Sequence, residues 1–110
     1  LAMQNRRLEE ARRYVEQALE YAPEQASILD TYGYICYLQN DFATAADVLY
    51  KAYQLNPSVK IGVRYARSLY MNGDIQHFHQ VLQQLQQNHP NDPELKQLNS
   101  LLLAPQNQTS

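Results

Sequence analysis

One stretch decides the fold of this chain: residues 26–59, which read ASILDTYGYICYLQNDFATAADVLYKAYQLNPSV. Its first half spaces apolar side chains by three and four residues, which gathers them on one face of a helix, at Ile28, Leu29, Tyr32, Ile35 and Cys36. The polar pair Asn40-Asp41 then favours a turn, and Asp41 can accept backbone N–H bonds at the start of a following helix. The first half therefore predicts a helix that ends at a short turn.

The second half of the stretch carries another apolar stripe at helical spacing, formed by Phe42, Ala45, Val48, Leu49, Ala52 and Leu55. Pro57 ends this stripe, because proline cannot continue a helix interior and also disfavours helical geometry at the residue before it. The whole stretch is therefore expected to form two helices joined by the Asn40-Asp41 turn.

This pattern recurs when the sequence is shifted against itself. A shift of 34 residues superimposes Leu8 on Phe42, Ala11 on Ala45, Ala18 on Ala52 and Pro23 on Pro57. A shift of 33 residues superimposes Tyr32 on Tyr65, Tyr37 on Tyr70, Asp41 on Asp74, Leu49 on Leu82 and Pro57 on Pro90. Self-similarity at such a period indicates an array of stacked units. After the last unit, Asp92-Pro93-Glu94 predicts a final helix with Asp92 as its N-cap.

The composition is that of an ordinary soluble domain: 110 residues, of which 45% are hydrophobic and 18% charged, with a net charge of −2. The lack of a basic excess argues against nucleic acid as the main partner. No apolar run approaches the roughly 18 residues that a membrane helix needs, so direct membrane insertion is not expected. The one cysteine cannot form an intrachain disulfide, and the compartment, cytoplasm or bacterial cell envelope, stays open.

These residues resemble the tetratricopeptide repeat, a helix–turn–helix unit of about 34 residues. The resemblance is carried by Leu29, Tyr32, Gly33, Asn40, Asp41, Phe42, Ala45, Leu49, Ala52 and Pro57. It implies an all-α fold, a right-handed α-solenoid of antiparallel helix pairs with about two and a half repeats and a C-terminal capping helix. It also implies that the two helices of a unit cross at Gly33 and Ala45, where small side chains permit close approach.

We expect one repeat domain over residues 1–103 and a disordered tail over residues 104–110. Within the domain the expected parts are an incomplete first repeat (1–25), a second repeat (26–58), a third repeat (59–91) and a capping helix (92–103). The first repeat is expected to keep one helix, from about Leu8 to Tyr21, preceded by a stub over Leu1–Gln4. Because the chain begins at Leu1 rather than at a methionine, we interpret it as part of a longer tetratricopeptide repeat protein.

The third repeat departs from the family pattern at two positions. Gly62 stands where the repeat usually has a bulky residue, and Phe78 stands where it usually has a small one. Cores tolerate such an exchange when the total volume is kept. We therefore expect Phe78 to fill the gap left at Gly62.

The sequence offers little for catalysis, and we predict no enzymatic activity, no cofactor and no metal site. His77 and His79 are two residues apart on a predicted helix, so they point about 200° apart and cannot clasp one metal ion. Cys36 belongs to the buried stripe, where a thiol behaves as a small hydrophobe. The interleaved charges of the first helix, Arg12 and Glu16 among them, are interpreted as a solvated, ion-paired face.

Binding is the more promising chemistry. The resemblance implies a concave groove lined by the first helix of each repeat, and its candidate residues here are Asp30, Tyr34, Tyr37, Lys60, Arg64, Arg67, Tyr70 and Met71. Tyrosine and arginine are the residue types that tend to dominate binding energy. The alternative interpretation is that Tyr37 and Tyr70 only pack between units.

Lys60 and Arg64 lie one helical turn apart and could hold a carboxylate together. The pair is similar to part of the carboxylate clamp of some chaperone-associated tetratricopeptide domains. Thr31, however, stands where that clamp has an asparagine. We therefore favour a general anionic contact through Lys60, Arg64 and Arg67.

The sequence thus predicts a non-catalytic scaffold that binds a peptide or helix of a partner protein in the groove. One alternative is a homodimerisation module that uses the apolar face of the N-terminal helix, formed by Leu8, Ala11, Val15, Ala18 and Leu19. Another is an accessory repeat segment of a larger bacterial protein of cell-envelope, polysaccharide-export or pilus-assembly systems.

Overall fold

The computed structural model describes residues 2–100, with side chains from residue 5 onward. It contains α1 (Ala2–Tyr21), α2 (Ala26–Leu38), α3 (Phe42–Leu55), α4 (Val59–Met71) and α5 (Ile75–Asn88), followed by a helix over residues 93–100. The part of the chain that is described contains no β-strand. The predicted all-α fold is therefore confirmed.

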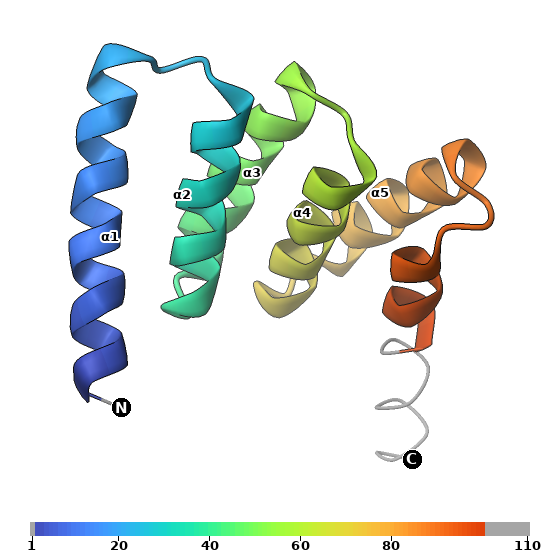
Figure 1. Cartoon of the computed structure of the whole chain (residues 1–110). Coiled ribbons are helices and arrows are strands. Elements are labelled where there is room, and N and C mark those ends of the chain that lie inside the picture. The colour runs from blue at the N-terminus through green and yellow to red at the C-terminus, as the bar shows by residue number, and fades with distance from the viewer. Residues whose placement is uncertain (1, 101–110) are drawn as a thin grey trace.

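The helices form a row of antiparallel hairpins (Figure 1). α2 packs against α3, α3 against α4, and α4 against α5, while α1 packs against α2 at one end of the row. In the view of Figure 1, α2 and α4 lie in front of α3 and α5. We call the side formed by α2 and α4 the first-helix face, and the side formed by α3 and α5 the second-helix face. This two-layered row is the α-solenoid that the repeat predicts.

Both hairpins turn in the same way. Asn40, after α2, has a positive φ of 64°, and Gly73, at the equivalent place after α4, has a φ of 83°. The residue that follows each of them donates its N–H to a carbonyl five residues back, Asp41 to Cys36 and Asp74 to Leu69, both at 2.9 Å. This is the helix-ending motif that needs a left-handed residue, which glycine and asparagine tolerate best.

One aspartate caps the start of the second helix in each hairpin. The Asp41 carboxylate accepts the N–H of Thr44 at 3.4 Å, and the Asp74 carboxylate accepts the N–H of His77 at 3.3 Å. Asp92 accepts the N–H of Glu94 at 2.9 Å at the start of the last helix. The N-cap roles predicted for Asp41 and Asp92 are thus confirmed, and they fix where each helix begins.

Close approach between α2 and α3 depends on Gly33. A Cβ atom at this position would overlap the Leu49 side chain, which is fully buried against it. Ala45 and Ala52 are also fully buried on the same helix, α3. Small residues on both helices therefore let one large side chain, Leu49, fill the crossing, as the family resemblance implies.

The expected exchange of volume between Gly62 and Phe78 is wrong. A Cβ at Gly62 would lie 2.5 Å from Cδ2 of Leu85 and 3.0 Å from a ring carbon of Tyr53, so these side chains occupy the space. Phe78 packs instead against Tyr70, with ring centroids 5.2 Å apart. The reason is topological: in an antiparallel hairpin the start of α5 lies beside the end of α4, and Gly62 is at the start of α4.

The N-terminal helix is longer than predicted. α1 runs without a break from Ala2 to Tyr21, so residues 2–4 continue the helix instead of forming a separate stub. No glycine or proline interrupts these residues, and most of them have good helix propensity. The predicted tail over residues 104–110 and the last residues of the predicted capping helix lie outside the described residues.

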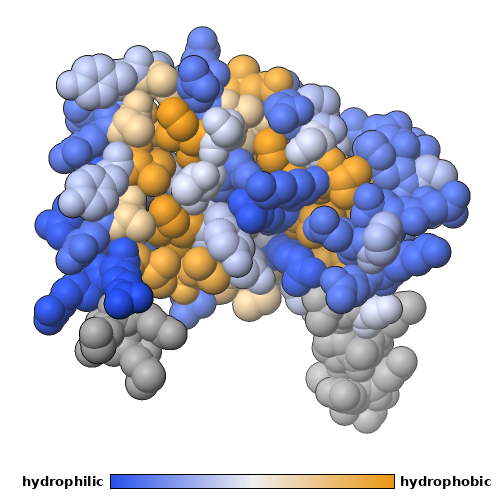
Figure 2. Space-filling model, viewed as in Figure 1, coloured by the Kyte–Doolittle hydropathy of each residue, from blue (hydrophilic) through white to orange (hydrophobic). Residues whose placement is uncertain are grey.

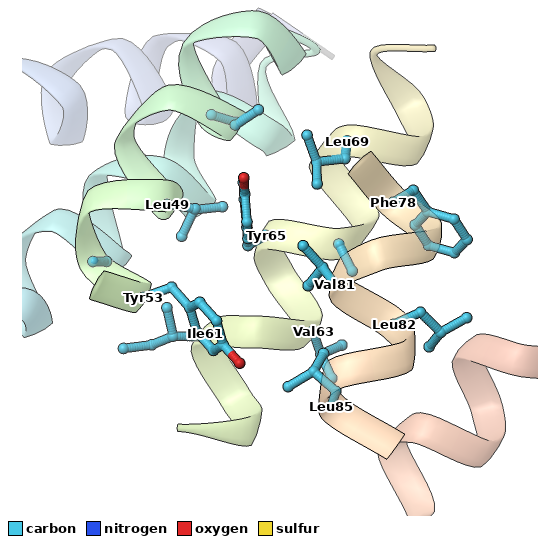
Figure 3. Close-up of a cluster of buried hydrophobic side chains, with 14 of the residues drawn as sticks. Leu49, Tyr53, Ile61, Val63, Tyr65, Leu69, Phe78, Val81, Leu82 and Leu85 are labelled. Carbon is cyan, nitrogen blue, oxygen red and sulfur yellow. The ribbon is translucent and has the colours of Figure 1, made fainter. Parts of the chain in front are cut away.

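The core is a continuous seam of apolar side chains between the two layers. Figure 3 shows its central part, where Leu49 and Tyr53 from α3 meet Ile61 and Tyr65 from α4. Phe78 and Leu85 from α5 are fully buried at the next interface. The hairpin of α2 and α3 therefore packs against α1 on one side and against the hairpin of α4 and α5 on the other.

Replacing Gly33 with alanine should destabilise the protein by about 1–3 kcal/mol, because the added methyl overpacks the crossing at Leu49. Helix propensity alone gives the opposite sign, since alanine favours a helix over glycine by about 1 kcal/mol. Urea unfolding followed by circular dichroism measures the difference. Thr31→Ala, an exposed change on the same helix, is the control and should alter stability little. An increase in stability for Gly33→Ala would contradict the close-approach argument.

Candidate functional site

All eight residues predicted to line a binding groove belong to the first helices, α2 and α4. The structure leaves three of them, Tyr34, Lys60 and Met71, exposed. Four others, Tyr37, Arg64, Arg67 and Tyr70, are half-buried, and Asp30 is buried. Seven of the eight predicted groove residues are therefore at least partly accessible, and one, Asp30, is not.

The buried carboxylate joins the two first helices. Asp30, on α2, is only 5% exposed, and its Oδ2 accepts a hydrogen bond from Nη1 of Arg64, on α4, at 2.9 Å. Nζ of Lys60 lies 3.9 Å from the same oxygen. The other oxygen, Oδ1, is also buried and has no hydrogen-bond partner among the described residues. Arg64 is thus the main partner of the buried Asp30 side chain, and burial of an ion is costly unless it is paired.

The Asp30–Arg64 pair also positions the aromatic ring of Tyr34. The guanidinium carbon of Arg64 lies 4.2 Å from the centroid of the Tyr34 ring, within cation–π range. Tyr34 remains 40% exposed. Arg64 contacts the Tyr34 ring and is itself hydrogen-bonded to Asp30. The orientation of the Tyr34 ring is therefore set before any partner binds.

The sequence predicts that Lys60 and Arg64 contact an anion, and in the structure both face an anion of the chain itself. Lys60 keeps about two thirds of its side chain exposed, however, and Arg67 is half-buried on the same helix. Three cations therefore stand against one carboxylate on this face. Figure 2 shows hydrophilic surface at the place of α4, beside hydrophobic surface between α1 and α2.

Tyr37 and Tyr70 occupy equivalent places in successive repeats and have equivalent surroundings. The Tyr37 ring packs edge-on against Phe42 with centroids 5.3 Å apart, and Tyr70 packs against Phe78 at 5.2 Å. Both tyrosines also contact the core while staying partly exposed. They therefore combine a packing role with an accessible edge.

Arg12 lies in a cluster that the sequence does not reveal. The sequence predicts that Arg12 belongs to a solvated face, yet its Nη1 reaches Gln39 at 3.0 Å and Asp41 at 3.3 Å, across from α1 to the turn after α2. It also faces the Tyr32 ring at 5.5 Å, and the Tyr32 hydroxyl donates to Glu16 at 2.9 Å. Only the Arg12–Glu16 spacing of four residues hints at this network, because its other partners are distant in sequence.

Three further features bear on other chemistry: the cysteine, possible metal ligands and the length of the apolar helices. Cys36 is fully buried, and this burial raises the pKa of its thiol, so the reactive thiolate is disfavoured. Residues 5–100, whose side chains the structure describes, contain no cluster of three or more His, Cys, Asp or Glu residues that could hold a metal ion. None of the described helices is long and apolar enough to cross a membrane.

Two family models match the chain. Each is described as a tetratricopeptide repeat, and they cover residues 1–59 and residues 36–102. A comparison with curated proteins found no match. The overlapping matches span both complete hairpins and α1, in agreement with the repeat spacing of the sequence.

The Asp30–Arg64 pair should respond unequally to loss of its two partners. Arg64→Met strands a buried carboxylate and is expected to cost about 2–3 kcal/mol of folding stability, whereas Asp30→Asn leaves a half-exposed guanidinium and should cost about 1 kcal/mol. Thermal unfolding of the two variants and of the double variant gives the coupling between them. Equal losses, with no coupling, would show that the pair does not anchor α2 to α4.

Proposed function

Because the chain belongs to the tetratricopeptide repeat family, whose repeats generally mediate protein–protein interaction, we propose that its first-helix face binds a segment of a partner protein. The proposed role is that of a scaffold without catalytic activity. The segment would lie along α2 and α4 as an extended strand or a helix.

The observation that carries this proposal is the anchored pair of Tyr34 and Arg64. A tyrosine ring that is already oriented loses little conformational entropy on binding, which is a main source of affinity in preorganised sites. Tyr37 and Tyr70 offer further aromatic edges at repeat-related positions, and Met71 offers an adaptable apolar contact. These side chains together supply the aromatic and apolar anchors that binding hot spots use.

The charge of the face defines the partner further. Lys60, Arg64 and Arg67 outnumber Asp30, so an acidic segment is favoured over a basic one. The carboxylate of Asp30 already occupies Arg64, which leaves Lys60 and Arg67 as the cations that a partner can reach. We therefore infer that the bound segment carries acidic residues beside at least one apolar or aromatic anchor.

A random peptide library displayed on phage tests this proposal without a known partner. Selected peptides should be enriched in acidic residues, and Tyr34→Ala should weaken their binding about tenfold, equal to about 1.4 kcal/mol. The charge-reversal variant Lys60→Glu should do the same, and the effect should shrink at high salt. Fluorescence anisotropy of a labelled peptide gives the affinities.

Matched controls lie on other surfaces of the molecule. Tyr14→Ala on α1 and Lys51→Glu on α3 remove an exposed tyrosine and reverse an exposed cation away from the first-helix face. Both should bind the selected peptides as the wild type does. Equal binding by all four variants would refute the proposal.

Homodimerisation is a second candidate function, favoured by the position of α1. Among the described helices α1 packs only against α2. Its apolar stripe of Leu8, Ala11, Val15, Ala18 and Leu19 is only partly buried. A second copy of this chain could cover the remainder, since incompletely covered apolar faces favour association.

Sedimentation over a range of protein concentrations tests the second candidate. A dimer that forms as the concentration rises, and that Val15→Asp abolishes, would support it. The fold of Val15→Asp must be verified by circular dichroism, because Val15 is half-buried. A monomer at every concentration would exclude self-association as the function of this surface.

A further inference from the structure

A hollow on the second-helix face combines aromatic rings with negative charge. It has a volume of about 420 Å³ and lies between α3, the end of α4 and the start of α5. Its polar lining comes from Asp47, Tyr50, Tyr65, Asn72, Asp74 and His77. These residues are distinct from those of the first-helix face, so the hollow is independent of the function proposed above.

Tyr65 forms the floor of the hollow. It is only 9% exposed, yet its hydroxyl makes no hydrogen bond to any described residue. Figure 3 shows the ring standing between Leu49 and Leu69, with its oxygen directed away from the backbone of α4. The fully buried side-chain oxygen without a partner among the described residues is Oδ1 of Asp30, so the Tyr65 oxygen itself is not sealed from solvent. The hydroxyl therefore opens onto the hollow and is free to bond a group that enters it.

Tyr50 forms a wall beside this floor. Its ring centroid lies 5.9 Å from that of Tyr65, with the ring planes inclined by 55°, and the side chain is half exposed. The two rings pack against each other, and the half-exposed ring of Tyr50 leaves aromatic surface open to the hollow. The π face of an aromatic ring attracts cations. Ala43 and Leu69 add apolar surface at the sides.

The hollow is also anionic. Asp47 is exposed and has no ion-pair partner among the described residues, while Asp74 caps α5 and holds the imidazole Nδ1 of His77 at 2.6 Å. Burial raises the pKa of Tyr65, and the neighbouring Tyr50 and the carboxylates of Asp74 and Asp47 raise it further. These effects place both carboxylates within electrostatic reach of the Tyr65 hydroxyl.

We propose that this hollow binds the ammonium group of a lysine side chain presented by a partner protein. The ammonium has three N–H donors, and the hollow offers three acceptors in Asp47, Asp74 and the Tyr65 hydroxyl. The ring of Tyr50 faces the charge, and the methylene stem of the lysine lies along Ala43 and Leu69, as long cationic side chains do on apolar surfaces. An anion would be repelled, and a purely apolar group would leave the Asp47 carboxylate unpaired.

Tyrosine-selective NMR tests this assignment with defined probes. The whole chain, labelled with ¹³C in its tyrosine rings, is titrated with the peptide acetyl-Gly-Lys-Gly-amide at about pH 8, where imidazole side chains in general carry little charge. The lysine peptide should shift the Tyr50 and Tyr65 signals. A peptide with norleucine in place of lysine has the same stem without the charge and should leave them unmoved.

Variants separate binding from folding. Asp47→Asn and Tyr50→Leu should each weaken lysine binding roughly three- to thirtyfold. The matched controls Glu10→Gln and Tyr21→Leu change an exposed carboxylate on α1 and a 92% exposed tyrosine, and should bind as the wild type does. Tyr65→Phe removes a hydroxyl that has no partner, so its melting temperature should not fall, although its lysine binding should weaken.

Three outcomes would overturn the proposal. The first is equal shifts from the lysine and norleucine peptides, which would leave no role for the charge. The second is equal shifts from an arginine peptide, which would contradict the assignment to an ammonium group. The third is a lysine response confined to Tyr34, Tyr37 and Tyr70, which would place the cation on the first-helix face.

Discussion

The crossing of α2 and α3 at Gly33 is the contact on which the rest of this structure depends. With no side chain at that point, Leu49 reaches the backbone of α2 and is fully buried there. The position of α3 against α2 then affects the position of α4 against α3. The reason is that Ala52 and Tyr53, also on α3, belong to the core shared with α4. Interior packing is dense enough that a shift at one crossing is felt at its neighbours.

Both faces of the molecule follow from this stacking. On one side the register of α2 and α4 brings the carboxylate of Asp30 to Arg64, which lies 34 positions later in the sequence. On the other side the register of α3 and α5 leaves a hollow where Tyr50 and Tyr65 meet two aspartates. The same packing therefore closes an ion pair on one face, and on the opposite face it leaves the Asp47 carboxylate beside aromatic rings with no ion-pair partner among the described residues.

The regular part of the fold could be predicted because local rules and repeat spacing agree. Asp41 can cap any helix that starts directly after it, and Pro57 cannot continue the interior of a helix that precedes it. The side chains that meet across repeats are harder to foresee. Leu85 and Tyr53, not Phe78, fill the space at Gly62, because the antiparallel arrangement decides which ends are neighbours. The residue types at positions 62 and 78 do not show which ends of α4 and α5 lie side by side, so the predicted exchange of volume could not be checked from the sequence.

Electrostatic contacts were the least predictable feature for the same reason. Lys60 and Arg64 carry the charges expected of an anion site, but the sequence does not show that Asp30 faces them. Arg12 has a plausible partner four residues away, and its stronger contacts are to Gln39 and Asp41, more than twenty residues away. From the sequence alone, charged residues on a helix are predicted to be solvent-exposed. Their ion pairs with a neighbouring helix become visible only when the position of that helix is known.

The ion pair between neighbouring repeats has a consequence for how such an array could grow. A duplicated copy of the second repeat, inserted after the original, would place Thr31 and Ser27 of the copy where Arg64 and Lys60 now stand. The inserted unit would match in shape and helix length, but the Asp30 carboxylate would face two neutral hydroxyls in a dry interface. Complementary charge thus gives the hairpins a fixed order, and neighbouring units that look alike are not interchangeable modules.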